Sequence, residues 1–530
     1  MKKILVIMLF FLMVSPCWAA TLPETLQLLE AKVERWEVEN VWPEVLRALA
    51  EHPGNGDLLA TAANIAYHRG DYQEALRLME RSLAAGGEDE LRRGFALFIA
   101  ETAKALAPYK KYETPNFIIY LDEKQDGVLV DYLAETLEKT QQAMARLYGF
   151  TPREKVRVEL FRDAGAFYRG SALSARDIEV AGAVGLAKFN KLQFLSPRAL
   201  VHGYRWLDAI SHEYMHYLIV KLTANKAPIW FHEGFAKYEE DKWRRGPGYL
   251  SPLYQALLAR ALKDGKLIGF DKMEPSLLRL ETPEEVQLAY AQSASAIDFI
   301  IQSRGHETLK QVMARMAQSR TPGAGEAIRE VMGLDFVRFE EEWKDHLAAR
   351  AGVGTGAGTD LKSVPAPAVN VRRFQVREGE AEDGRMELKE IKSLVARNRA
   401  HLGDRLKERG RMRAAALEYR RALTELGDSL PIMNRLSAAL IDLGQTDEAL
   451  AILRRASELD PDHPTPYVQL GQIYLQRKNF REASKVFEES LQINPFNPEV
   501  HAGLATALAA LGDHAGSARE RKIANILLGQ

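Results

Sequence analysis

Cysteine is almost absent from this sequence: Cys17 is the only one in 530 residues. A single thiol cannot build a disulfide framework, so packing has to hold the folded chain together. The sequence also has no excess charge of either sign, because 71 basic and 72 acidic residues leave a formal net charge of -1. A chain with this balance lacks the basic footprint of a nucleic-acid-binding protein, and we expect no nucleic-acid partner.

Long apolar runs are equally scarce. The one exception is "ILVIMLFFLMV", which follows two lysines at the N-terminus and precedes Cys17 and Ala19 at a small-x-small spacing. Such a run is too short to cross a bilayer comfortably and is typical of a secretory signal peptide. We therefore expect residues 1–19 to be removed, no membrane span to remain, and the protein to be exported to a periplasm-like compartment. In the alternative, Cys17 is acylated and anchors a lipoprotein.

The C-terminal part of the chain repeats at a shift of 34 residues. "LGQTDEALAILRRASELDP" aligns with "RKNFREASKVFEESLQINP", which pairs Ala449 with Ala483 and Pro461 with Pro495. The register resembles the tetratricopeptide repeat, a helix pair with small residues at close helix contacts. The resemblance covers residues 396–530, as three full repeats and a final partial one. It implies a concave surface that binds a protein or peptide partner.

A weaker copy of the same pattern, "AYHRGDYQEALRLMERSLAAG", lies near the N-terminus. It places glycine, tyrosine and alanine in the order found at the turn and second helix of the repeat. We expect residues 20–110 to form a small helical domain of repeat-like hairpins.

The middle of the chain differs from both ends in its residue pattern. "NFIIYL" and "KVRVEL" are rich in β-branched and aromatic residues and predict two strands with an amphipathic helix between them, while "GLAKFNKLQFL" predicts a hairpin. Residues 111–350 are therefore predicted to be an α+β domain. The glycine- and proline-rich stretch that follows predicts a flexible linker over residues 351–385, before the repeats at 386–530. The whole is a multidomain protein in which helical-repeat domains flank an α+β domain.

Candidate catalytic residues lie in the stretch "ISHEYMHYL". His212 and His216 are four residues apart, so a helix turns both imidazoles toward one point, as the first two ligands of a zinc ion require. Glu213 stands between them, where it can accept a proton from water without binding the metal. A third ligand is available in Glu233, on a second predicted helix that begins after a loop containing Pro228.

"HEYMH" followed by "WFHEGFAKYEE" resembles the gluzincin metallopeptidases of the peptidase MA type. The resemblance implies that His212, His216 and Glu233 bind one Zn²⁺ per chain and that Glu213 is the general base. The run that captures a free amine in the related aminopeptidases is missing, which favours an endopeptidase. Lys237 stands where thermolysin-like enzymes carry an Asp that orients a zinc-binding His, so the partner of that imidazole is left unidentified.

Two further features keep alternatives open. Gluzincins place a Tyr or His near the developing oxyanion, and Tyr290 is the candidate here, although it can equally pack within its own helix. The predicted hairpin is either the sheet edge on which an extended peptide docks or an ordinary structural hairpin. His202 and His232 are left out of the metal set, because three protein ligands suffice.

These features together predict an exported zinc-dependent endopeptidase that hydrolyses a protein or peptide substrate, with repeats that recruit the substrate or a partner. The alternative is a non-catalytic scaffold, whose repeats do the work beside a relic metallopeptidase domain.

Overall fold

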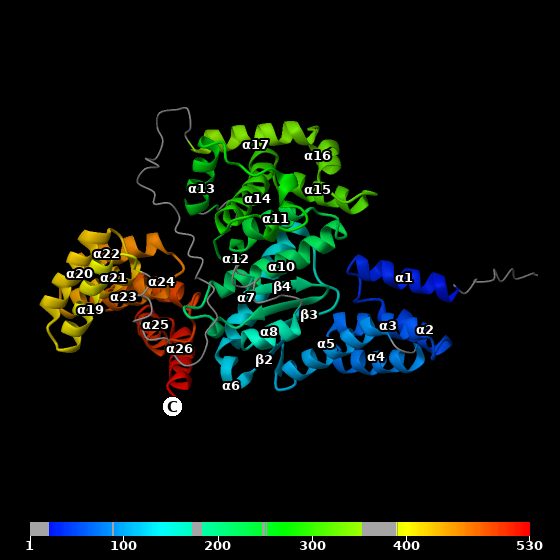
Figure 1. The fold of residues 1–530 in the computed structure, drawn as a ribbon, viewed down its shortest axis with the longest axis horizontal. Coiled ribbons are helices and arrows are strands. Elements are labelled where there is room, and N and C mark those ends of the chain that lie inside the picture. The colour runs from blue at the N-terminus through cyan, green and yellow to red at the C-terminus, as the bar shows by residue number, and fades with distance from the viewer. Residues whose placement is uncertain are drawn as a thin grey trace, which may run out of the picture.

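The computed structural model describes residues 21–86, 89–171, 183–245, 250, 252–351, 388 and 391–529. The expected signal peptide lies outside the described residues, and so does the expected linker apart from residue 351. Figure 1 shows a central part with a small sheet, N-terminal helices on one side and a curved helical array on the other. The described helices include none that is both long and apolar enough to cross a membrane.

The N-terminal part is a set of antiparallel helices. Asn55 begins the third helix by accepting a hydrogen bond from the Leu58 backbone, and Gly70 ends it with a φ of +82° that other residues rarely adopt. The third and fourth helices form the hairpin that the repeat-like sequence predicts. The helices are α1 (Leu22–Glu34), α2 (Trp42–Glu51), α3 (Gly56–Arg69), α4 (Tyr72–Gly86) and α5 (Glu90–Leu106).

The central sheet has the strand order β1-β2-β3-β5-β4. β2 and β3 are the two strands that the sequence predicts, β4 and β5 are its hairpin, and β1 is a strand that it does not predict. Pairing is antiparallel between β1 and β2, parallel from β2 through β3 to β5, and antiparallel between β5 and β4. The strands are β1 (Lys110–Glu113), β2 (Phe117–Leu121), β3 (Val156–Phe161), β4 (Gly185–Lys188) and β5 (Lys191–Leu195).

Helices cover both faces of this sheet. On one face lie α7 (Val130–Tyr148), which connects β2 to β3, and α10 (Trp206–Thr223). The opposite face carries buried polar groups that the N-terminal helices satisfy: the Tyr72 hydroxyl donates to Glu159 at 2.6 Å. Because the Glu159 carboxylate has this hydrogen bond, it can be buried between the sheet and the N-terminal helices.

The remaining central elements are short turns around the sheet and a helical layer beyond α10. The short elements are α6 (Glu123–Asp126), α8 (Ala164–Gly170) and the 3₁₀ helices at Gly127–Leu129, Pro197–Ala199, Phe270–Met273 and Leu277–Arg279. The layer consists of α11 (Ile229–Glu239), α12 (Lys242–Arg245), α13 (Pro252–Lys263), α14 (Pro283–Arg304), α15 (His306–Gln318), α16 (Gly325–Met332) and α17 (Phe336–Ala351).

The described residues 391–529 include four consecutive helix pairs. They are α19 (Leu394–Glu408), α20 (Met412–Leu426), α21 (Leu430–Asp442), α22 (Thr446–Leu459), α23 (Pro464–Gln476), α24 (Phe480–Leu491), α25 (Pro498–Ala510) and α26 (His514–Leu527). Small residues stand where helices touch, as the 34-residue register predicts. A Cβ added to Gly471 would lie 2.3 Å from the Phe487 ring. The multidomain architecture expected from the sequence is confirmed.

Gly471→Ala tests this packing. In an open helical position, replacing Gly by Ala stabilises a protein by about 0.4–1 kcal/mol. At Gly471 the methyl group meets the Phe487 ring, so we expect a destabilisation of about 1–3 kcal/mol, the scale of overpacking. Gly94→Ala in α5 is the matched control, because nothing lies within 4 Å of the Cβ it adds. Chemical unfolding of the full chain measures both, and a gain in stability at Gly471 would contradict the account.

Candidate metal centre

Two imidazoles face the same point from α10. His212 and His216 are one helical turn apart, and their ring centroids lie 4.7 Å from each other at an interplanar angle of 84°. Two elements pack against one face of their helix, since Thr140 of α7 reaches Ser211 at 3.4 Å and the Tyr214 ring contacts Phe117 of β2. The helix therefore presents the histidines from a rigid support.

A tight reversal of the chain brings a carboxylate to the same point. Ala224 and Asn225 follow the end of α10 with left-handed φ values of +52° and +58°, and Pro228 is the N-cap of α11. Through this reversal Glu233 returns to α10. Its Oε2 lies 3.5 Å from the Nε2 of His212 and 3.5 Å from the Nε2 of His216.

These distances suit a tetrahedral zinc ion. Zinc bonds of about 2.1 Å in a tetrahedron leave neighbouring ligand atoms about 3.4 Å apart. Glu233 Oε2 is also buried without a hydrogen-bond partner among the described residues, although burial of an unpaired carboxylate oxygen is costly. A cation between the three side chains would remove this cost, so His212, His216 and Glu233 fit the metal that the sequence implies.

Glu213 lies beside the three ligands. One of its carboxylate oxygens and the ring nitrogens of His212 and His216 all lie within 4.8 Å of one another. On its other side is β4, where a Cβ at Gly185 would come within 2.7 Å of the Glu213 Cγ. Burial raises the pKa of Glu213 above its ordinary value, and the nearby imidazoles oppose this rise. The carboxylate therefore stands between the histidines and the strand at the sheet edge.

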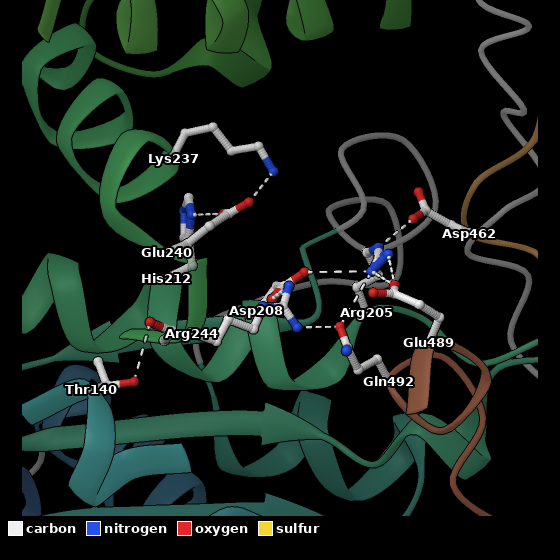
Figure 2. Close-up of polar contacts among 11 residues, drawn as sticks. Thr140, Arg205, Asp208, His212, Lys237, Glu240, Arg244, Asp462, Glu489 and Gln492 are labelled. Carbon is white, nitrogen blue, oxygen red and sulfur yellow. Dashed lines mark hydrogen bonds and ion pairs between the residues drawn. The ribbon is translucent and has the colours of Figure 1, made fainter. Parts of the chain in front are cut away.

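The partner of His212 is Glu240, a residue that the sequence analysis missed. Glu240 Oε2 lies 3.0 Å from His212 Nδ1, and Glu240 Oε1 accepts a hydrogen bond from Lys237 at 2.5 Å (Figure 2). Burial alone would raise the Glu240 pKa, but the charges of Lys237 and His212 outweigh it and lower the pKa to about 2. Glu240, seven residues after Glu233, is thus the partner of the His212 imidazole that the sequence left unidentified.

Tyr290 lies next to the site, as one of its two expected roles requires. Its ring centroid is 6.5 Å from that of His212, and burial together with the charge of Glu233 raises its pKa well above the ordinary value. With this raised pKa the phenol of Tyr290 stays protonated at neutral pH and can donate a hydrogen bond. Tyr290 lies on α14, which approaches α11 closely at Gly234, because a Cβ there would lie 2.3 Å from the Ser293 carbonyl oxygen.

The two histidines that the sequence analysis left out of the metal set, His202 and His232, occupy different surroundings. The His232 ring lies 5.9 Å from that of His216, and burial together with the charge of His216 lowers its pKa to about 3. His202 is near the repeats, with its ring centroid 4.6 Å from that of His463. Neither belongs to the group whose ligand atoms converge.

Glu240→Gln tests the role of the missed carboxylate. The amide keeps the size of the side chain but loses the charge that holds His212 in place, so zinc affinity should fall by about 10–100-fold. Glu307→Gln is the control, because that exposed carboxylate pairs with Lys310 away from the site. Competition with a chromophoric chelator measures both affinities. An unchanged affinity in Glu240→Gln would show that His212 does not depend on this contact.

Comparison with known families agrees with this geometry. A profile of the Peptidase MA superfamily matches residues 139–349. Profiles of the tetratricopeptide repeat match residues 57–86, and also residues 406–473 and 440–507. The chain contains a peptidase MA superfamily domain and tetratricopeptide repeats. The matched residues 139–349 include all the candidate site residues, namely His212, Glu213, His216, Glu233 and Tyr290.

Individual relatives named for tetratricopeptide repeats match part of the chain. Small glutamine-rich tetratricopeptide repeat-containing protein 2 of Mycosarcoma maydis is 24% identical over 121 residues, which are 22% of this chain and 34% of that protein. The chain thus spans about a third of that relative's length. Among solved structures, MamA from AMB-1 is 22% identical with a TM-score of 0.23, over 27% of this chain and 79% of MamA. A thermophilic tetratricopeptide repeat protein of Thermus thermophilus is 23% identical with a TM-score of 0.24, over 26% and 75% of the two chains.

Proposed function

We propose that the protein is an exported zinc-dependent endopeptidase. The observation that carries this proposal is the convergence of two imidazole nitrogens on one carboxylate oxygen, at 3.5 Å each, with a second carboxylate alongside. His212, His216 and Glu233 would hold one zinc ion and leave a position open for water, as catalytic zinc sites do. Export rests on the N-terminal sequence alone.

The chemistry divides between the bound metal and the residues of the chain. Zinc, when bound, lowers the pKa of water and polarises the substrate carbonyl. Glu213 accepts a proton from the attacking water as the new carbon–oxygen bond forms. It then gives the proton to the amine nitrogen as the carbon–nitrogen bond breaks, so the carboxylate is regenerated. The Tyr290 hydroxyl donates a hydrogen bond to the oxygen that gains negative charge.

Strand β4 supports an extended peptide as the substrate. It lies at one edge of the described sheet, and the close packing of Gly185 on Glu213 puts this edge next to the proposed base. A peptide that adds to β4 would pair its backbone with the backbone of the strand, and its scissile bond would lie beside Glu213. Cleavage within a chain needs no group that captures a terminal amine, which agrees with an endopeptidase.

The repeats support recruitment of a protein or peptide. A hollow of about 310 Å³ lies on the array. Its lining includes one residue from each of the four helix pairs, either in the first helix of the pair or at its N-cap: Lys407, Ile441, Gln472 and Asn497. Side chains of mixed polarity that gather from successive repeats can bind an extended segment at several points. We propose that this surface holds a partner or a part of the substrate away from the site of cleavage.

Two substitutions separate the proposed base from the proposed ligand. Glu213→Gln keeps the shape of the side chain but cannot accept a proton, so zinc should remain bound while hydrolysis falls by about 10²–10⁴-fold. Glu233→Ala removes a ligand, so zinc binding itself should weaken. Each purified variant is assayed beside the parent for bound zinc and for cleavage of a broad peptide library.

The outcomes distinguish the enzyme from the scaffold. If Glu213→Gln cleaves as fast as the parent, the mechanism proposed for Glu213 is wrong. If the parent cleaves no peptide while a partner still binds the repeats, the scaffold alternative replaces the endopeptidase.

A further inference from the structure

The helix that carries both histidines begins against the C-terminal repeats. Arg205, at the N-cap of α10, supplies no side-chain cap. Instead, the backbone N–H of Trp206 donates to the Gln492 carbonyl at 3.1 Å, and that of Tyr204 donates to the Ile493 carbonyl at 3.1 Å. The Trp206 indole donates to the Leu491 carbonyl at 2.9 Å. Three donors at the start of α10 thus meet three successive carbonyls of the repeats.

Two of these carbonyls, those of Leu491 and Gln492, belong to the end of α24, and that of Ile493 follows directly. α24 ends at Leu491, and the last four carbonyls of a helix have no partner within it, just as the first N–H groups of a helix have none. The end of α24 and the start of α10 therefore satisfy each other. The contact also brings the negative end of one helix dipole to the positive end of another, which is favourable.

The backbones approach so closely that a glycine is needed. Gly203 has a φ of +76°, and a Cβ at this position would lie 2.1 Å from the Ile493 carbonyl oxygen. A clash with a backbone oxygen cannot be relieved by turning a side chain. Gly203 thus allows the backbone before α10 to lie directly against the backbone of the repeats.

Ion pairs surround the backbone contact. Arg205, with 21% of its side chain exposed, donates to Glu489 at 2.5 Å and to Asp462 at 2.9 Å (Figure 2). Arg244, which follows α11, donates to the Gln492 side chain and also to Asp208 at 2.5 Å. Asp208 lies on α10 one turn before His212. The network therefore links the repeats to α10 and to α12, the short helix that follows α11.

We propose that the C-terminal repeats are a positioning element of the metal site, because they hold the first turn of α10 and through it His212. This inference rests on the proposed zinc site, and it assigns the repeats a task beyond recruitment. If the repeats left this contact, the first turn of α10 would lose its partners. The histidines would then be less well placed to bind a metal together with Glu233.

Charge reversal across the contact tests the inference. Arg205→Glu places a carboxylate against Glu489 and Asp462, and Glu489→Arg places two guanidinium groups together. In each single variant of the full chain, we expect the amides of residues 206–213 to exchange hydrogen about fivefold faster, the scale of a lost helix cap. Zinc affinity should fall by a similar factor, and the double variant should recover part of both losses, because it restores one opposite pair.

The control is Arg477→Glu, an equal change in charge on the repeats, where Arg477 pairs with exposed Asp447. It should leave exchange in α10 and zinc affinity unchanged. If Arg205→Glu does not give folded protein, Arg205→Gln removes the charge without reversing it and serves in its place.

The readouts separate this inference from the proposed function. Unchanged exchange and zinc affinity in both single variants would overturn it, and so would faster exchange in α10 with no loss of zinc affinity. If the parent protein neither binds zinc nor cleaves peptide, the proposed function fails. Hydrogen exchange alone then decides whether the repeats hold α10.

Discussion

The structure depends on how α10 is fixed, because this one helix supplies two of the three proposed metal ligands and must hold them still. Its N-terminal end meets the C-terminal repeats through the backbone of Tyr204 and Trp206. At the other end, Lys221 donates to the Trp36 carbonyl at 2.8 Å and pairs with Glu39 at 2.5 Å, both in the N-terminal part. The three parts of the chain therefore meet along a single helix, and the helical parts on either side both contribute to the support of the site.

The second constraint is electrostatic. The site gathers Glu213, Glu233 and Glu240 around two imidazoles in a largely buried place, where unpaired charge is costly. Lys237 offsets Glu240, and Glu240 in turn faces His212. Burial lowers the His212 pKa, but the carboxylates of Glu233 and Glu240 outweigh it and raise the pKa to about 10. The buried carboxylates thus favour positive charge at His212, and a metal ion that binds this imidazole would take the place of its proton.

Local pattern was enough to predict most of the site from the sequence. His212 and His216 share a helix face by spacing alone, whereas Glu233 was predicted from the resemblance to gluzincins and from the loop with Pro228, which lets the chain reverse. Glu240 is the acid seven residues beyond Glu233, but the usual spacing of the family points to position 237, where Lys237 stands. The docking of α24 on α10 could not be predicted, because it joins backbone groups that lie far apart in the sequence, as where the Trp206 N–H donates to the Gln492 carbonyl, and no side-chain pattern records it.

The most direct measurement of the central claim is the coordination of the metal in the purified full chain, by elemental analysis and X-ray absorption at the zinc edge. The account predicts one zinc per chain, bound by two imidazole nitrogens and by oxygen at about 2.0–2.2 Å. Substoichiometric metal that added zinc does not raise, or a coordination shell with fewer than two imidazoles, would contradict it.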